Sequence, residues 1–312
     1  MTNQLITVFG GSGFLGRYVV QALLKSGARV RIAARDPRGG LFLKTQGGLG
    51  QTQFVAADIR KQETVARALD GSDGVINLVG ILKGDFQGFH VGGARTVAKA
   101  AAAAGVTALV QVSAIGADPL SASAYGKSKG EGEVAVRAAF PGATILRPSI
   151  VFGREDQFVN RFANLIRMLP VVPIIKGDAK FQPVYVGDVA KAIVAALGDV
   201  TKYGGKTYEL GGPEVISMGE LNRRVAQAAG RAPLFAELPD AVSAAFATLT
   251  GWLPFAPLSR QQWKLLKAGN VASGQYPGCQ ALGITPRPLG LFLDRWLVRF
   301  RKHGRFGNQA KP

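Results

Sequence analysis

Short apolar runs alternate with amphipathic segments through the first half of the chain. The apolar run at residues 5–8 predicts a strand, and Leu15, Val19, Leu23 and Leu24 then share one face of a helix that ends before Gly27. Further apolar runs predict strands at residues 29–34, 53–57, 74–79, 108–113 and 143–146. This alternation is typical of an α/β fold with a doubly wound parallel sheet and right-handed crossovers.

The spacing of these elements is less regular elsewhere. Residues 36–50 are glycine-rich and predict an irregular connection where a helix would usually stand. After about Val151, prolines and glycines punctuate shorter elements, although residues 184–197 predict a return to the sheet. We therefore expect a nucleotide-binding domain at residues 1–200, with part of 151–180 on the substrate side, and a smaller C-terminal α/β domain at 201–312.

A glycine-rich turn joins the first strand to the first helix. Its spacing is G-x-x-G-x-x-G, in which one glycine allows a tight turn, one allows backbone amides to approach a pyrophosphate, and one allows the helix to pack closely. The helix N-terminus carries free amides and a partial positive charge. Because 41 glycines are scattered through the 312 residues, the turn alone is weak evidence for a binding site. Its position between a strand and a helix is what predicts a Rossmann-type dinucleotide site. The residues expected to bind the phosphates are Gly10, Gly13, Phe14, Leu15 and Gly16.

A tyrosine and a lysine follow the fifth predicted strand at a spacing of four. Tyr125 and Lys129 would share one helical face, where the lysine ammonium would lower the pKa of the phenol and prepare it for acid–base catalysis. Ser113, at the end of the fifth strand, would hold a substrate oxygen. A tyrosine and a lysine at this spacing usually form a surface pair, but their position after the glycine turn and these strands makes the motif much more specific for a catalytic pair.

These motifs together resemble the short-chain dehydrogenase/reductase superfamily, in its extended and atypical branches. The resemblance covers most of the first 150 residues and implies a catalytic triad of Ser113, Tyr125 and Lys129. It also implies that Tyr125 and Lys129 contact the cofactor, together with an adenine-contacting turn, a turn after the fourth strand and a strand end beside the nicotinamide. The residues at those three places are Asp58, Ile59, Leu78, Val79, Gly80 and Pro148.

A narrower resemblance extends further along the chain. Residues 145–158, 181–190 and the basic tail 299–307 look like the NADPH-binding accessory subunits of respiratory complex I and their bacterial relatives. This resemblance implies a tightly held nucleotide that serves structure or assembly rather than turnover. A related branch implies a link to ubiquinone biosynthesis.

The end of the second predicted strand bears on the choice of cofactor. NAD binders usually carry an acid there for the ribose, whereas NADP binders carry an arginine near the 2′-phosphate. Arg35 stands at that place and Arg17, inside the first helix, would approach from the other side, so we expect NADPH in preference to NAD(H). The competing interpretation makes Asp36 the ribose acceptor and Arg35 a solvated residue.

Charge and composition limit the partners and the compartment. The net charge of +18 suggests an anionic partner such as an anionic membrane surface or a respiratory or quinone-biosynthesis complex, unless it serves solubility alone. Dispersed basic residues without a binding motif argue against nucleic acid. With a lone Cys279, no signal peptide and no apolar run long enough to span a bilayer, we expect a cytoplasmic protein, either free or peripheral on the inner face of the cell membrane.

Histidines and the C-terminal segment leave further alternatives open. His90 and His303 are the only histidines, so no metal site is expected, and His90 is either a proton relay or simply hydrogen-bonded. The apolar stretch at residues 238–258 predicts one short helix, with core packing favoured over membrane contact. A terminal helix is either packed with a basic edge or an interfacial anchor. Its apolar and basic residues are Phe292, Leu293, Trp296, Leu297, Phe300, Arg295, Arg299 and Lys302.

Two functions from different classes remain. The first is an NADPH-binding protein of the complex I accessory-subunit type, linked to quinone metabolism or assembly at the respiratory membrane. The second is an active NADP-dependent reductase, epimerase or dehydratase that uses Ser113, Tyr125 and Lys129.

Overall fold

The computed structural model describes residues 1–238, 269–302 and 304, and the chain folds into two compact units. Unit 1 contains Met1–Pro148, Val186–Leu210 and Ala272–Thr285, and unit 2 contains Ser149–Tyr185, Gly211–Val271 and Pro286–Pro312. The division into residues 1–200, with part of 151–180 on the substrate side, and residues 201–312 stays a prediction. In the structure the chain passes between the two units several times, because β11 and residues 272–285 return to unit 1.

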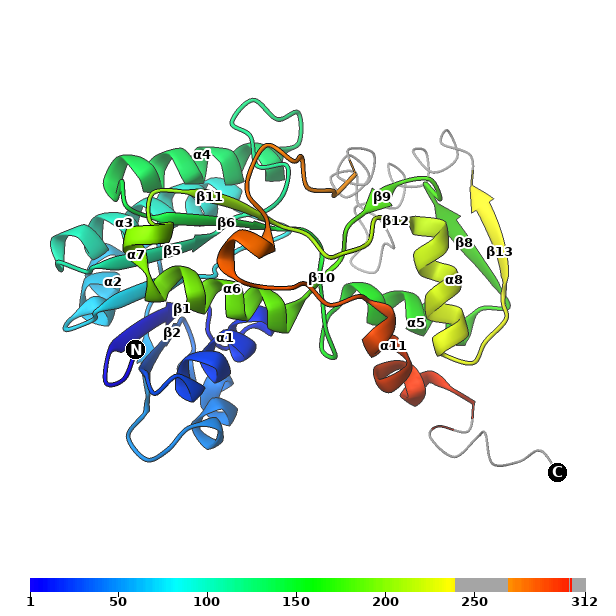
Figure 1. The fold of residues 1–312 in the computed structure, drawn as a ribbon, viewed down its shortest axis with the longest axis horizontal. Helices are drawn as coiled ribbons and strands as arrows, with labels where there is room; N and C mark the ends of the chain where they lie inside the picture. Colours follow the sequence, from blue (N-terminus) through cyan, green and yellow to red (C-terminus); the bar gives the residue numbers. More distant parts are fainter. Residues whose placement is uncertain (239–268, 303, 305–312) are drawn as a thin grey trace. The chain divides into compact units, whose positions relative to one another are not determined.

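Unit 1 is built on a parallel sheet with the strand order β11-β6-β5-β4-β1-β2-β3, seven strands among the described residues (Figure 1). Both faces of this sheet are covered, so Val8, Ile32 and Ile76 are fully buried, which explains the continuous apolar runs in the sequence. The doubly wound Rossmann-type prediction is confirmed. The strands are β1 Leu5–Phe9, β2 Arg29–Ala34, β3 Thr52–Ala56, β4 Gly74–Asn77, β5 Ala108–Val112, β6 Thr144–Pro148 and β11 Thr207–Leu210.

Helices flank the sheet of unit 1 in two groups. Helices α2, α3 and α4 follow one another, with α3 in contact with both of the others, while α1 packs against α6. The first group closes a core in which Val65, Val97 and Val136 are fully buried. The helices are α1 Phe14–Lys25, α2 Gln62–Leu69, α3 Ala94–Ala103, α4 Ala124–Ala139, α6 Val186–Gly198 and α7 Val200–Tyr203.

Three helical segments of the 3₁₀ or π type also belong to the described part of unit 1. The connection at residues 36–50, predicted to be irregular, contains the 3₁₀ helix η1 Pro37–Gln46. This helix begins where the Asp36 side chain accepts a hydrogen bond from the Arg38 amide. A π-helix, η2 Gln87–Gly93, leads directly into α3. The turn η3 Cys279–Leu282 packs on α6.

Unit 2 has its own apolar core and short strand pairs. Strand β8 Val171–Ile175 pairs in parallel with β13 Leu234–Leu238, while helices α5 Phe158–Met168 and α8 Met218–Ala228 pack together. The remaining pairs are β7 Val151–Phe152 with β10 Val184–Tyr185, and β9 Lys180–Phe181 with β12 Ile216–Ser217. The short helix predicted within residues 238–258 lies outside the described residues, apart from Leu238.

The predicted terminal helix is present as α11 Gly290–Leu297, followed by the 3₁₀ turn η4 Val298–Phe300. Its aromatic face points into unit 2, where the Phe292 ring stacks on Tyr185 at 4.1 Å and on Trp296 at 5.0 Å between centroids. Arg299 donates to the Asn160 side chain at 2.6 Å. Because these aromatic side chains are used in packing, the helix has the arrangement of a packed element with a basic edge.

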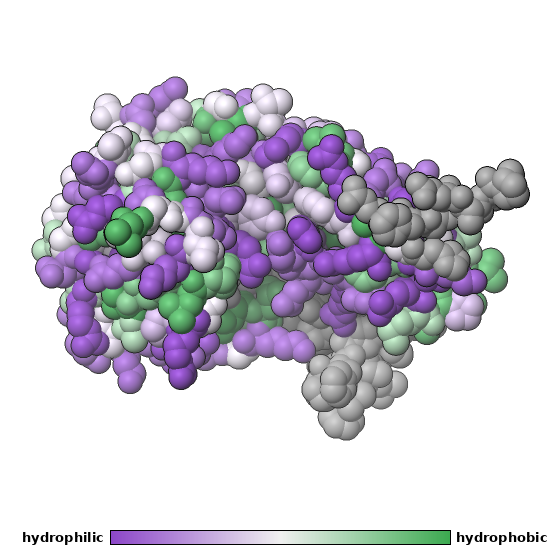
Figure 2. All heavy atoms as spheres, turned by 90° about the horizontal axis from the view of Figure 1, so that it is seen from below, coloured by the Kyte–Doolittle hydropathy of each residue, from purple (hydrophilic) through white to green (hydrophobic). Residues whose placement is uncertain are grey.

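Hydrophilic residues cover most of the face drawn in Figure 2, and hydrophobic residues gather there in smaller patches. Within residues 1–238, 269–302 and 304, no helix has both the length and the apolar character needed to cross a bilayer.

Candidate functional site

The glycine turn between β1 and α1 has the geometry of a phosphate cradle. Gly10 has a φ of +79°, a conformation that favours glycine, and its amide donates to the Ala33 carbonyl at 3.2 Å. A Cβ on Gly16 would lie 2.3 Å from the Gly10 carbonyl oxygen, so only glycine fits where α1 packs against the turn. Gly13 caps α1 without a side chain and the first turn holds no acidic residue, which leaves the amides of Phe14 and Leu15 open to an anion.

The end of β4 lies against this turn. A Cβ on Gly10 would be 3.5 Å from Leu78, and the Leu78 amide donates to the Phe9 carbonyl at 3.0 Å. Buried Asn77 accepts from the Val79 amide at 3.1 Å and donates to Gln111 at 2.9 Å. The structure therefore brings two of the predicted cofactor turns together and uses Asn77 to fix the second.

The end of β3 carries a tightly paired carboxylate. Asp58 binds the Arg60 guanidinium through both oxygens, at 3.0 and 2.6 Å, and this interaction lowers the pKa of Asp58 to about 2. Its neighbour Ile59 is buried and would be met at 2.4 Å by a Cβ on Gly93. Asp58 is thus ionised at neutral pH, while Ile59 belongs to the core.

The arginines expected near a 2′-phosphate lie against different aromatic rings. The Arg35 guanidinium lies 5.6 Å from the Phe89 centroid, whereas Arg17 lies 5.0 Å from that of Phe42, with its Nε buried and without a described partner. Asp36, the alternative ribose acceptor, binds Arg38 at 2.9 and 3.0 Å, and this contact lowers the pKa of the carboxyl.

The three residues of the predicted triad converge near the end of β5. Lys129, buried on α4, reaches the Val112 carbonyl at 3.5 Å and lies 6.0 Å from the centroid of the Tyr125 ring. Ser113 is the next residue after that carbonyl, and its buried Oγ has no hydrogen-bond partner within the described chain. A Cβ on Gly80 would lie 3.1 Å from Lys129 Nζ, so the end of β4 also borders this cluster.

The pKa values of the pair differ from the expectation. Burial raises the pKa of Tyr125 to about 12 and lowers the pKa of Lys129 to about 8. The expected lowering of the tyrosine pKa is the opposite of what is found. Because Lys129 is itself desolvated and donates to a backbone carbonyl, it does not offset the cost of placing a phenolate in a buried environment.

His90 is held between two elements as a neutral side chain. Its Nε2 accepts from the Ile81 amide at 3.0 Å, which assigns the ring proton to Nδ1, and Nδ1 then donates to Ser128 Oγ at 2.9 Å. Ser128 in turn donates to the Tyr125 carbonyl at 2.9 Å. Burial, with the Lys129 charge, lowers the pKa of His90 to about 3, which favours the hydrogen-bonded interpretation over a proton relay.

Aromatic residues around this site were not identified from the sequence. Phe86 stacks on His90 at 5.3 Å and meets the Tyr125 ring edge-on at 6.1 Å, and Phe89 holds arginine side chains. No motif marks these phenylalanines. The sequence does contain one repeated signal near this site: the pattern Asp-x-Arg occurs at residues 36–38 and 58–60, shortly after β2 and β3.

Beside Pro148, at the end of β6, lies a buried ion network. Arg147 pairs with Glu133 at 2.7 Å and approaches Glu209 at 3.9 Å, while Glu209 also accepts from Ser273 Oγ at 2.9 Å. The Pro148 carbonyl accepts from the Ile115 amide at 3.1 Å. This network neutralises the arginine and joins residues 272–285 to β11 and α4.

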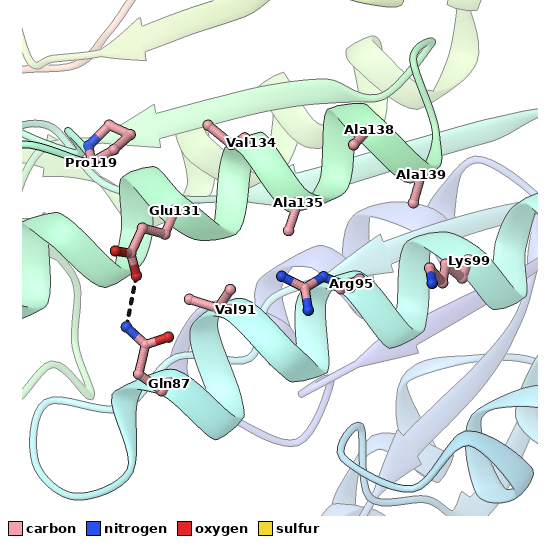
Figure 3. A pocket seen from close by; sticks show the side chains of 10 residues that line it. All are labelled: Gln87, Val91, Arg95, Lys99, Pro119, Glu131, Val134, Ala135, Ala138 and Ala139. Atoms are coloured by element: carbon pink, nitrogen blue, oxygen red, sulfur yellow. Dashed lines mark hydrogen bonds between the residues drawn. The ribbon is translucent and has the colours of Figure 1, made fainter.

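A hollow lies away from these residues, along α3 and α4 (Figure 3). It has a volume of about 700 Å³ and is lined by Arg95 and Lys99 on α3 and by Ala135 and Ala139, which point toward α3 from α4. Its lining includes none of the predicted site residues. No group of three or more His, Cys, Asp or Glu side chains that could hold a metal ion occurs in the part of the chain that the structure describes, to which His303 does not belong.

Comparison with known proteins identifies the family. Residues 6–211 match the NAD dependent epimerase/dehydratase family. The chain belongs to this family. It is also homologous to subunit 9 of the alpha subcomplex of mitochondrial NADH dehydrogenase [ubiquinone] 1. The mouse protein is 38% identical over 311 residues, which is 97% of this chain and 82% of the relative.

Proteins named for other activities are similar as well. Ceramide reductase of Caulobacter vibrioides is 30% identical over 251 residues, 76% of this chain and 74% of the relative. The crystal structure of the NADPH-dependent quinone oxidoreductase of Escherichia coli, complexed with NADPH, matches with a TM-score of 0.75 at 23% identity, covering 93% of this chain and 99% of that one. At that identity the likeness concerns the fold.

Proposed function

We propose that this chain is an NADPH-binding protein of the complex I accessory-subunit type, in which the nucleotide is held tightly and stabilises the protein. The observation that carries the proposal is the homology to NADH dehydrogenase subunit 9 over 97% of the chain. A chain matched over nearly its whole length shares both units with that subunit, whereas a cofactor motif alone would match only unit 1.

The chemistry of unit 1 supports binding. The open amides after Gly13 and the Arg35 side chain fit the phosphates of a dinucleotide, and no acidic residue stands in the first turn of α1. Asp58 and the amide-fixed turn at Val79 would hold the adenosine half. NADPH is the proposed nucleotide because Asp36, the acid that would favour NAD, is bound by Arg38.

The nucleotide that copurifies with the protein tests this proposal. We expect NADPH or NADP⁺ at close to one per chain, retained through extensive dialysis, and a fall in melting temperature when it is stripped. Gly13→Asp should remove the nucleotide because a carboxylate would face the phosphates, while Tyr125→Phe should retain it. A purified chain that binds neither NADPH nor NADH would contradict the proposal.

We also propose a peripheral site of action at the respiratory membrane, in quinone-linked metabolism or in assembly. The net charge of +18 and the relatives in NADH dehydrogenase support an anionic surface as partner. Flotation with vesicles of anionic and of zwitterionic lipid, at rising salt, tests it. We expect binding only to the anionic vesicles and loss of binding as salt increases; failure to float at low salt would exclude a direct lipid contact.

A second candidate is an NADP-dependent reductase. The observation that favours it is Ser113 Oγ, buried and unpaired one residue after the carbonyl that binds Lys129. Ser113 would donate to a substrate carbonyl oxygen, Tyr125 would deliver the proton to that oxygen, and Lys129 would orient the ribose. Bound NADPH supplies the hydride to the carbonyl carbon. The epimerase and dehydratase activities of the family are alternatives with the same residues.

Turnover separates the two candidates. If purified protein oxidises NADPH with a quinone or carbonyl substrate and Tyr125→Phe abolishes that activity, the reductase is supported and the structural cofactor is excluded. If Tyr125→Phe leaves the cellular phenotype intact while Gly13→Asp abolishes it, nucleotide binding is what matters.

A further inference from the structure

Two turns of the same build follow adjacent strands of the sheet in unit 1. In each, an aspartate accepts from the backbone amide of the arginine two residues later, at 3.0 Å, and binds its guanidinium through both oxygens. The pairs are Asp36 with Arg38 after β2 and Asp58 with Arg60 after β3. Their surroundings differ: the Arg38 side chain is 84% exposed, whereas that of Arg60 is 41% exposed and lies over Phe89.

Phe89 binds two guanidinium groups. Arg60 lies 4.4 Å and Arg35 lies 5.6 Å from the centroid of this one ring. Phe89 belongs to η2, far along the chain from both arginines, so their meeting is a product of the fold. The carboxylates of Asp58 and Asp85 raise the pKa of Arg60, so this guanidinium stays charged at the ring that Arg35 also contacts.

Arg17 does not join this cluster. Its guanidinium lies over Phe42, which belongs to η1. No contact between Arg17 and either Arg35 or Phe89 occurs among the described interactions, although the sequence predicted that Arg17 would complete the phosphate site with Arg35.

Resting on the proposed binding of NADPH, we propose that Arg35 and Arg60, held together on Phe89, bind the 2′-phosphate of the nucleotide, and that Arg60 is therefore a determinant of specificity for NADPH. A phosphate dianion at this ring would accept hydrogen bonds from both guanidiniums. NADH lacks this group, so it gains nothing from the pair.

Binding of NADPH and of NADH to matched glutamine variants tests the proposal. Arg60→Gln keeps a donor for Asp58 and removes the charge. We expect Arg60→Gln and Arg35→Gln each to weaken NADPH binding about tenfold or more, as for the loss of one hydrogen-bonded charge, and to leave NADH binding within about twofold. Arg29→Gln, at the opposite, amino end of β2, is the control and should change neither constant.

A double variant separates direct contact from neutralisation of Asp58. If Arg60 only cancels the Asp58 carboxylate, Asp58→Asn combined with Arg60→Gln restores the wild-type preference for NADPH, and the direct contact is wrong. If Arg60 contacts the phosphate, the double variant has the same reduced preference for NADPH over NADH as Arg60→Gln alone. The proposed function assigns Asp58 to the adenosine half, which both nucleotides share, so the ratio of the NADPH and NADH dissociation constants isolates the phosphate.

The remaining outcomes are equally decisive. The assignment is overturned if Arg60→Gln leaves the ratio of NADPH affinity to NADH affinity unchanged. It is also overturned if Arg17→Gln or Arg38→Gln lowers this ratio and Arg60→Gln does not. If Arg60→Gln fails to fold, Phe89→Leu decides instead: a selective loss of NADPH affinity supports the paired arginines, and an unchanged ratio excludes them. A wild-type chain that binds neither nucleotide contradicts the proposed function itself, whereas the variants test only this subsite.

Discussion

The phosphate end and the Ser113–Tyr125–Lys129 end of the candidate site lie in one unit but are prepared to different degrees. At the glycine turn, the amides after Gly13 are uncapped. Arg35 contacts an aromatic ring and forms no ion pair within 4 Å among the described residues, although its charge acts on Asp58, so charge is in place for an anion. At the triad, burial raises the pKa of Tyr125 and lowers that of Lys129, so at neutral pH the phenol is protonated and the lysine is a desolvated cation.

This difference separates binding from chemistry. A preformed cradle binds anions at little cost in reorganisation, whereas Tyr125, whose pKa desolvation raises to about 12, is protonated and a poor base at neutral pH. It remains able to donate a proton, so the triad is better suited to reduction of a carbonyl than to oxidation of an alcohol. The proposed role, in which the nucleotide stabilises the protein, requires the binding end of the site and not the triad.

The largest expected effect is at the glycine turn. Gly16→Ala places a Cβ 2.3 Å from the Gly10 carbonyl oxygen, and backbone atoms there cannot move without opening the turn. We expect loss of nucleotide binding and a free energy of unfolding lower by about 3 kcal/mol or more. Fluorescence of bound NADPH and urea denaturation measure both effects.

The matched control for this change is Gly39→Ala. Gly39 is exposed in η1 and an added Cβ would meet nothing within 4 Å. Its nucleotide affinity and stability should stay at the wild-type values. Equal effects of the two substitutions would mean that the turn is less constrained than its geometry indicates.

At the predicted triad, Lys129→Met should raise the free energy of unfolding at neutral pH. The Lys129 pKa falls from 10.5 to about 8 on folding, so below pH 8 the folded state carries a desolvated cation, at a cost of about 3 kcal/mol. As pH rises from 8 to 10.5 the folded protein loses this proton before the unfolded chain does, and wild-type stability rises.

Denaturation of Lys129→Met at pH 7 and pH 10 checks this sign. The variant should be the more stable protein at pH 7, and its advantage should shrink towards pH 10. Lys127→Met, at an exposed position two residues earlier, should show no such dependence. A variant that is destabilised equally at both pH values would show that packing around the lysine outweighs the burial of its charge.

His90 gives a smaller effect of the same sign, in an acidic range of pH. Because its pKa falls from 6.5 to about 3 on folding, the unfolded chain takes up a proton first, and stability decreases as pH falls below 6.5. Between pH 6.5 and 4.5 we expect a loss of about 2 kcal/mol from this group. His90→Asn should lose that part of the acid sensitivity while being less stable at pH 7, as measured by urea denaturation at both pH values.

The smallest effect concerns Asp36. If its carboxylate serves mainly to bind Arg38 and begin η1, Asp36→Ala should leave the dissociation constant of NADH within about twofold. Titration with NADH measures it. A tenfold loss for NADH with no loss for NADPH would restore Asp36 as the ribose acceptor and reverse the proposed preference.

The sequence located most of the sheet and the phosphate cradle. Predicted strands at residues 29–34 and 108–113 agree with β2 and β5 to within a residue, and the glycine turn lies between β1 and α1 as expected. These features are local: a buried strand needs a continuous apolar run, and a tight turn against a helix needs glycine at Gly10 and Gly16. The sequence did not predict η1, because its glycines are typical of an irregular loop and the 3₁₀ helix depends on the Asp36 cap.

What the sequence determined by itself is the order of strands and helices, the glycine turn, and the spacing that places Tyr125 and Lys129 on one helix. Only the tertiary structure decided that Arg60 rather than Arg17 shares a ring with Arg35, that His90 is neutral, and that Tyr125 is raised in pKa rather than lowered. These properties depend on side chains that are distant in the chain and on burial, and a local pattern of residues specifies neither.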